Sequence, residues 1–200
     1  KSKSVACAGG AYEPTPSPRR NEPAPRYNTV RINRHDGPED GALPDRCLTL
    51  GLPEFGAATG SFRRIVQTPG GISIFYDVGQ GQGWQRNIIM DGRPHLPPSI
   101  RQWYGDSRGH WEGDTLVVDV VNQNGKSWLD QAGNFVDKNV HVVERYTMTS
   151  ENAIRYEATI TDPTVYSLPW TMRIELRRQP RGTEIIEYDC VEGERDEIHY

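Results

Sequence analysis

Apolar and polar residues alternate along most of the chain after residue 61, and this period of two predicts β-strands. The alternating segments are short, and turns rich in Gly, Pro, Asn and Asp separate them. They comprise residues 62–67, 72–78, 84–90, 115–121, 140–149, 153–161, 170–176 and 183–190. No segment has the 3.6-residue apolar spacing of an amphipathic helix. The pattern predicts an all-β fold, an antiparallel meander of about 8–9 strands that closes into a barrel or folds into a sandwich.

The stretch from residue 104 to residue 119 differs from the rest because a polar cluster, a turn and an apolar strand follow one another within it. Glycine recurs there at every fourth position, which suits a backbone that bends repeatedly and packs closely. These glycines are Gly105, Gly109 and Gly113. The ionisable residues between them are two positions apart, so an extended strand places all of them on one face. They are Asp106, Arg108, His110 and Glu112.

Prolines dominate the beginning of the chain, where eight of the fifteen lie within the first 60 residues. Residues 1–45 also lack apolar periodicity, which predicts an extended arm that is partly polyproline II. Such a composition is typical of a disordered tail, whereas an ordered arm of this kind needs a partner surface to lie on. We expect self-association, or docking to another subunit, through residues 1–45. The β-domain then spans residues 46–193, and a polar tail spans residues 194–200.

The overall composition narrows the class of protein. A chain of 200 residues is long enough for one domain with its own core. Its net charge of −4 gives no support for binding to nucleic acid or to an anionic membrane surface. No run of 18 or more apolar residues is present, so the sequence predicts no transmembrane segment. The chain begins at Lys1 without a Met, which is typical of a processed protein and equally of a trimmed one, and we expect a periplasmic or extracellular location.

The cysteines also fit an exported protein. Cys47 precedes the first predicted strand, and Cys190 ends the last one. A Cys47–Cys190 disulfide would tie the two ends of the domain together, and closing so long a loop is worth about 4–5 kcal/mol in the chain-entropy model. The alternative is a pair of unrelated buried thiols. Cys7 is left over in either case, as a free thiol, a lipid attachment point or an intermolecular cross-link.

Four long motifs of the chain resemble a family of exported bacterial β-proteins without an established activity. The motifs are Asp91-Gly-Arg-Pro-His95, Gly105-Asp-Ser-Arg-Gly-His-Trp-Glu-Gly-Asp-Thr-Leu-Val-Val118, His141-Val-Val-Glu-Arg-Tyr146 and Tyr156-Glu-Ala-Thr-Ile-Thr-Asp-Pro163. A further motif, Glu187-Tyr-Asp-Cys190, belongs to the same pattern, so the resemblance covers residues 45–193. The resemblance implies export, but it implies no mechanism. The tail and the Pro-rich arm depart from the family pattern. A shorter likeness is lipocalin-like: the Trp-Glu-Gly-Asp-Thr-Leu turn followed by a meander.

Histidines and carboxylates supply two kinds of candidate chemistry. His110 and Glu112 form a His-x-Glu pair on one strand face, and His141 begins another strand. Two histidines and a carboxylate on adjacent strands are a donor set for zinc, iron or copper, which makes these three residues candidate metal ligands. In the catalytic alternative, His110 is a general base that Asp106 or Glu112 orients. Arg108 then stabilises an anion.

A purely structural interpretation uses the same part of the chain. Charged residues of opposite sign can pair in a buried network that braces loops against the sheet. The residues concerned are Asp106, Arg108, Glu112, Glu144 and Arg145. A histidine within such a network is a satisfied hydrogen-bonding group, with no catalytic or metal-binding role. This interpretation and the two chemical ones remain open from the sequence.

Aromatic residues suggest a carbohydrate as a further candidate ligand. The chain has five Trp and nine Tyr, and aromatic rings stack on sugar faces. Trp103 and Trp128 fall in predicted loops, where such platforms would lie, although large aromatic residues also fill β-cores. With His95 and Arg145 they form the set of candidate binding residues.

Two functional classes follow from these patterns. The first is a non-catalytic exported β-domain that acts as a subunit or binding module of a periplasmic or extracellular assembly, docked through its N-terminal arm. The second is an exported hydrolase or lyase, with or without a metal, that uses His110 with Asp106, Glu112 and His141. A cleft that gathers the histidines would favour the enzyme. Pairing of Arg108 and Arg145 with carboxylates would favour the binding module.

Overall fold

A computed structural model of the chain describes residues 51–53, 62–77, 84–129 and 134–184. The predicted arm at residues 1–45, the Cys47–Cys190 disulfide and the polar tail lie outside these residues. So does most of the strand predicted at residues 183–190. Over the described ranges, no helix has the length and apolar character that crossing a membrane requires.

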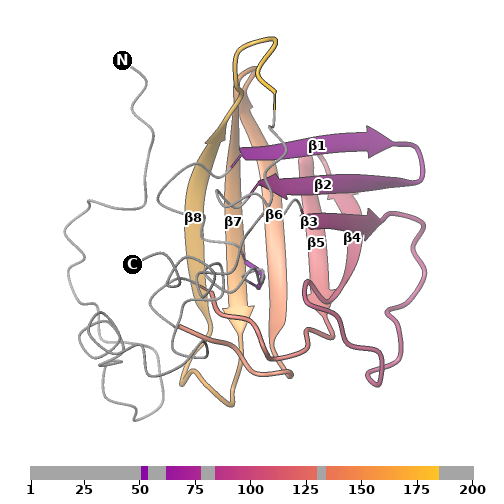
Figure 1. Cartoon of the computed structure of the whole chain (residues 1–200), viewed down its shortest axis with the longest axis vertical. Helices are drawn as coiled ribbons and strands as arrows, with labels where there is room; N and C mark the ends of the chain where they lie inside the picture. Colours follow the sequence, from indigo (N-terminus) through magenta and orange to yellow (C-terminus); the bar gives the residue numbers. More distant parts are fainter. Residues whose placement is uncertain (1–50, 54–61, 78–83, 130–133, 185–200) are drawn as a thin grey trace, which may run out of the picture.

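The described part of the chain is all-β, as the alternation of apolar and polar residues predicts (Figure 1). Its strands are β1 (Phe62–Thr68), β2 (Gly71–Asp77), β3 (Trp84–Ile89), β4 (Asp106–Glu112), β5 (Thr115–Val121), β6 (His141–Ser150), β7 (Ala153–Thr161) and β8 (Trp170–Arg177). All of them belong to one sheet, in which the strands lie side by side in chain order.

Six of the seven strand pairs are antiparallel, and the exception is the pair of β3 and β4. These two strands run parallel, and only two residue pairs join them, Ile88 with Ser107 and Ile89 with Arg108. A purely antiparallel meander was therefore the wrong prediction at this point. The cause is the connection from Met90 to Gly105, which carries the chain back past β3 before β4 begins.

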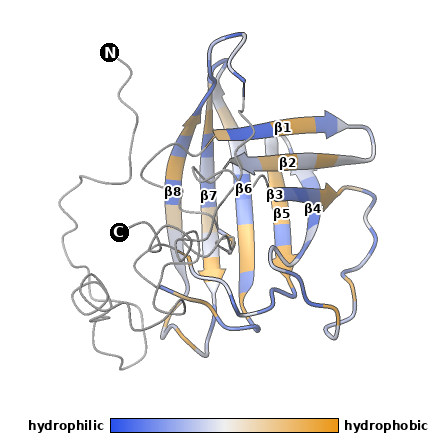
Figure 2. Cartoon of the chain, in the orientation of Figure 1, coloured by the Kyte–Doolittle hydropathy of each residue, from blue (hydrophilic) through white to orange (hydrophobic). Residues whose placement is uncertain are grey.

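The sheet curls into a half-barrel, and its inner surface holds the core. In Figure 1, β1 and β2 run across the direction of β6–β8, which gives the sheet its curl. Figure 2 shows apolar and polar positions alternating along the strands. On β7 the inward residues are Ile154, Tyr156, Ala158 and Ile160, the face that the alternation predicts. The described strands thus form one curled sheet. The sequence alone did not distinguish between a closed barrel and a sandwich.

The predicted role of the regularly spaced glycines is confirmed. Gly105 has a φ of +64°, and a Cβ there would lie 2.4 Å from the carbonyl oxygen of Val121. Gly109 has no room for a side chain, because its Cβ would lie 2.5 Å from Met90 Sδ and 2.7 Å from Ile88 Cγ2. The first glycine lets the chain turn tightly into β4, and the second lets β4 lie close against the core.

Candidate functional site

The four ionisable residues of β4 lie on the outer face of the sheet, as their spacing predicts. Their neighbours Ser107 and Gly109 point inward, toward the buried side chains of β3 and β5. The outer residues do not form one cluster, however. Asp106 and Arg108 belong to one group, and His110 and Glu112 belong to a second group at the other end of the strand.

Asp106 is the centre of the first group. Its side chain is 6% exposed, and its carboxylate accepts hydrogen bonds from Leu96 N at 3.0 Å and from Arg108 Nε at 3.0 Å. His95 Nδ1 lies 2.7 Å from the same carboxylate. Burial alone would raise the pKa of Asp106, but these three partners together hold it below its ordinary value. Asp106 is therefore an ionised anchor for the loop that carries His95 and Leu96.

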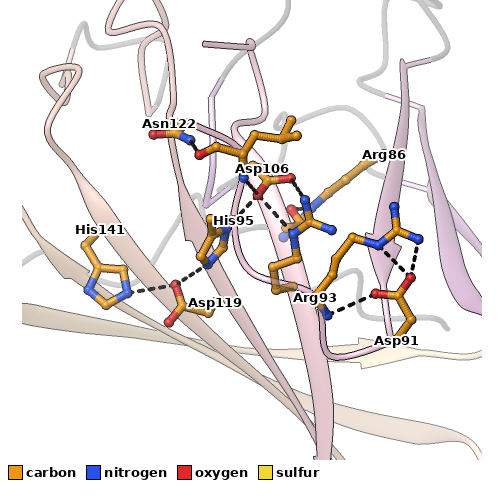
Figure 3. Close-up of polar contacts among 11 residues, drawn as sticks. Arg86, Asp91, Arg93, His95, Asp106, Asp119, Asn122 and His141 are labelled. Atoms are coloured by element: carbon orange, nitrogen blue, oxygen red, sulfur yellow. Dashed lines mark hydrogen bonds and ion pairs between the residues drawn. The ribbon is translucent and has the colours of Figure 1, made fainter. Parts of the chain in front are cut away.

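The contacts continue from His95 across the sheet. His95 Nε2 lies 3.3 Å from Asp119 Oδ1, and His141 Nε2 lies 3.0 Å from the same oxygen. Figure 3 shows the order of this chain, with His95 between Asp106 and Asp119, and His141 on the far side of Asp119. Exposure rises along it, from 27% for the side chain of His95 to 44% for that of His141. We call these four residues the outer relay, because carboxylates and imidazoles alternate in it.

The second group on β4 is exposed to solvent. His110 Nε2 lies 3.2 Å from Glu112 Oε1, and Arg145 Nη2 donates to Glu112 Oε2 at 2.8 Å. Arg145 and His110 hold the pKa of Glu112 below its ordinary value. Arg145, a candidate binding residue, is thus the ion-pair partner of a carboxylate at the end of β4.

The structure brings together two of the three candidate metal ligands, His110 and Glu112, and leaves the third apart. On β6, His141 lies four residues before Arg145, about 13 Å along the strand. Its imidazole contacts Asp119 instead. Within the part of the chain that the structure describes, no group of three or more His, Cys, Asp or Glu side chains is arranged to hold a metal ion.

The inner face carries a second polar network that sequence reasoning missed in part. Arg86 donates to both carboxylate oxygens of Glu144, at 3.1 Å and 2.5 Å, and to Ser107 Oγ at 2.9 Å. The side chains of Arg86 and Glu144 are 2% and 0% exposed. Glu144 therefore faces inward, whereas Arg145 faces outward. The prediction that both residues belong to one network is wrong, because they belong to two separate networks on opposite faces of the sheet. Alternation on β3 could have revealed Arg86, because it shares the inward face with Ile88.

Tyrosine hydroxyls complete the inner network. Tyr156 donates to Glu144 Oε1 at 2.6 Å, and Tyr146 donates to the same oxygen at 3.3 Å. Burial and the negative charge of Glu144 raise the pKa of both tyrosines well above its ordinary value, so the hydroxyls stay protonated and donate. Burial lowers the pKa of Arg86, but Glu144 holds it well above its usual range. The inner network is therefore one cation and one anion, enclosed and hydrogen-bonded.

A cleft of about 600 Å³ opens beside the short parallel junction, and we call it the β3–β4 cleft. It lies where β3 extends past the start of β4, so its lining comes from β3, the loop after it and the beginning of β4. Aromatic, amide and guanidinium side chains make up much of the lining. They include Trp84, Trp103, Gln85, Asn87, Arg93 and Arg108. Histidine is not among the described residues that line it.

The remaining candidate binding residues lie in different places. Trp103 lines the β3–β4 cleft, and His95 belongs to the outer relay. Trp128 forms an isolated bridge with Phe135, and its carbonyl oxygen accepts a hydrogen bond from Gly51 N at 2.8 Å. Trp128 is thus away from the cleft and braces the long connection between β5 and β6.

Comparison with known proteins finds no relative: no family model, curated protein or solved structure matches this chain. What the site can do chemically therefore follows from its geometry. That geometry offers an outer relay, an enclosed inner ion pair and one cleft lined by groups suited to a polar ligand.

Proposed function

We propose that the chain is a non-catalytic exported β-domain that binds a polar ligand in the β3–β4 cleft. The observation that carries this proposal is the lining of the cleft, where indole rings lie beside amides and guanidinium groups. A few oriented polar groups among larger rings are typical of small-molecule sites, and the cleft volume is within their usual range of about 300–1,000 Å³.

The pairing of the arginines supports binding over catalysis. Arg108 is paired with Asp106 at 2.9 Å, and Arg145 is paired with Glu112 at 2.8 Å. An arginine already neutralised by a carboxylate is less suited to stabilising a charge that develops during a reaction. The cleft also has no imidazole in its described lining to act as a general acid or base.

A thermal-shift screen of polar small molecules on the full chain tests the ligand site. A genuine cleft ligand raises the unfolding temperature of the wild type and of Trp111→Ala, but not of Trp103→Ala. Trp111 is the matched control, since its ring is 49% exposed and lies at the other end of β4. If no compound in the screen shows this behaviour, the result contradicts the proposal.

Assembly through the N-terminal arm is part of the same proposal. It rests on the Pro-rich composition of residues 1–45, which lie outside the described residues. Native mass spectrometry of the full chain and of a chain without residues 1–45 tests it. We expect an oligomer that dissociates on deletion, and a full chain that stays monomeric over a range of concentrations would refute it.

The Asp106–His95 contact favours a second candidate, an exported hydrolase or lyase. A buried carboxylate that orients an imidazole is the arrangement of a general base. This candidate differs from the expected one, in which His110 acts with Asp106, Glu112 and His141, because Asp106 here contacts His95. Turnover on a panel of ester and polysaccharide substrates distinguishes the two: activity lost in His95→Gln but kept in His110→Gln would support His95 as the base.

A further inference from the structure

We infer that the ligand of the β3–β4 cleft is an acidic saccharide, one whose sugar units carry carboxylate groups. The inference rests on the proposed function and adds the chemical class of the ligand. Three features of the cleft support it: its guanidinium groups, an arginine donor that no described residue satisfies, and the combination of ring and amide groups.

The guanidinium groups of the lining favour an anion. Three arginines line the cleft, and each has a carboxylate partner: Arg86 with Glu144, Arg93 with Asp91, and Arg108 with Asp106. The pair of Arg86 is enclosed in the core. The side chain of Arg93 is 64% exposed, so its guanidinium remains accessible to a competing anion. Arginine presents several donors in a fixed plane, which suits it to carboxylates.

Arg108 carries a donor that none of the described residues satisfies. Its Nε and Nη2 contact Asp106, while its Nη1 is buried and has no hydrogen-bond partner among the described residues. An unsatisfied buried donor destabilises the free protein. A ligand oxygen that reaches Nη1 after a small shift of this side chain removes that penalty by accepting a hydrogen bond, although Asp106 already neutralises the charge of Arg108.

The ring and amide groups favour a saccharide over a simple organic acid. Trp103 supplies a ring on which the apolar face of a sugar stacks, whereas the ring of Trp84 packs edge-on against Tyr104 beside the core. Gln85 donates to Ser73 Oγ at 3.0 Å and to Asn87 Oδ1 at 3.2 Å, which orients two amides at the cleft. Amides donate and accept at once, as paired hydroxyl groups require. A small acid would leave most of these groups unused.

The sheet itself makes room for such a ligand. Only two residue pairs join β3 to β4, so the residues of β3 before Ile88 have no strand partner on that side within the described ranges. Their backbone N–H and C=O groups add to the polar character of the cleft. An extended oligosaccharide can lie along this edge, with one acidic unit beside Arg93 and Arg108.

The test uses a short oligomer of galacturonate as the probe and isothermal titration calorimetry of the full chain. The matched control ligand is the methyl ester of the same oligomer, which keeps the sugar rings and removes the charge. We expect the acid to bind, the ester to bind at least about tenfold more weakly, and added salt to weaken the acid only.

Two pairs of variants locate the binding. Arg108→Gln is compared with Arg145→Gln, because both arginines are ion-paired on the outer face and only the first lines the cleft. Trp103→Ala is compared with Trp111→Ala. We expect about tenfold or greater loss for the first member of each pair and no loss for the second. Arg93→Gln is a further variant, chosen because that side chain is exposed and its loss leaves the fold intact.

The outcomes separate this inference from the proposed function. Equal binding of acid and ester, lost in Trp103→Ala, would overturn the acidic class and leave a cleft that binds neutral saccharides. Failure of both saccharides, with a cleft ligand found in the thermal-shift screen, would overturn the saccharide class alone. Binding that Arg145→Gln weakens as much as Arg108→Gln would show general attraction of an anion, and would also overturn the inference.

Discussion

The two polar networks of the sheet have the same chemical ingredients and opposite surroundings. The inner network pairs Arg86 with Glu144, and neither side chain is more than 2% exposed. The outer relay begins at the buried Asp106 and ends at His141, which is 44% exposed. One is closed to water, and the other is anchored at one end and open at the other.

The difference shows in how the partners are satisfied. Glu144 accepts from Arg86 and from two tyrosine hydroxyls, and all of these partners are buried. In the outer relay, His95 lies between two carboxylates, and an imidazole donates to both only when it is protonated. The inner network is thus enclosed by the core, whereas the outer relay stays partly open to solvent.

We expect the largest effect on stability when the buried carboxylate of the inner network is replaced. Glu144→Gln leaves the charge of Arg86 buried without a counter-ion, so we expect a loss of about 3–5 kcal/mol in the free energy of unfolding. Urea denaturation measures it, with Glu112→Gln as the exposed control. The double variant Arg86→Met with Glu144→Leu should recover only part of the loss, because it removes the unpaired charge but also the acceptor of the Tyr146 and Tyr156 hydroxyls. A single variant that loses under 1 kcal/mol would show that the inner pair does not hold the sheet.

The buried end of the outer relay comes next. Asp106→Asn removes the charged acceptor of Arg108, His95 and the Leu96 N–H, and we expect it to lower the free energy of unfolding by about 2 kcal/mol. Urea denaturation at neutral pH measures the change. Asp119→Asn is the matched control, because this carboxylate also contacts His95 but is 43% exposed. Equal losses in the two variants would mean that burial does not distinguish the ends of the relay.

Acid tests the same residue in another way. The pKa of Asp106 is lowered in the folded chain, so the stability it contributes is present above its ordinary value of about 3.8 and is lost as the pH falls through the lower folded value. Other carboxylates also have a lowered pKa, namely Asp91, Glu112 and Glu157, but they are present in the wild type and in the variant alike. We therefore expect the gap in stability between wild type and Asp106→Asn to narrow below pH 4. A gap that stays constant down to pH 2 would contradict the assignment.

We expect the smallest effect on stability from the exposed ion pair at the end of β4. Glu112 and Arg145 are both more than 40% exposed, and solvent screens their attraction. A double-mutant cycle of Glu112→Gln and Arg145→Gln should give a coupling too small to separate from experimental scatter. A coupling comparable to that of Arg86 and Glu144 would break the comparison, since exposure would then not decide what an ion pair contributes.

Much of the fold follows from local pattern, because alternation on a curled sheet decides which side chains meet the core. It placed Asp106, Arg108, His110 and Glu112 on one face, and it predicted the inward residues of β7. It did not predict which outer residues would pair. His95 reaches Asp106 only because the connection after β3 folds back over β4, and no local spacing encodes that long-range placement.

The side-chain pairs between distant strands could not be predicted from the sequence for a related reason. Glu144 and Arg145 are adjacent in sequence and were expected to share one network, although neighbouring strand residues face opposite ways. The true partner of Glu144 is Arg86, which is 58 positions away. The β3–β4 cleft could not be predicted either, because it exists only where two strands that pair in parallel barely overlap.

The short parallel junction also bears on the order in which the chain folds. β1–β3 and β4–β8 are each built from hairpins between neighbouring strands, whose contacts are close in sequence and form early. Among the described residues, the junction is the only strand pairing between the two halves, and their other contacts, in the core and between Arg86 and Glu144, join residues distant in sequence. We therefore expect changes at Arg86 to speed unfolding and to leave the folding rate nearly unchanged, as stopped-flow measurements can determine. A variant at Arg86 that slows folding instead would place the docking of the two halves in the transition state.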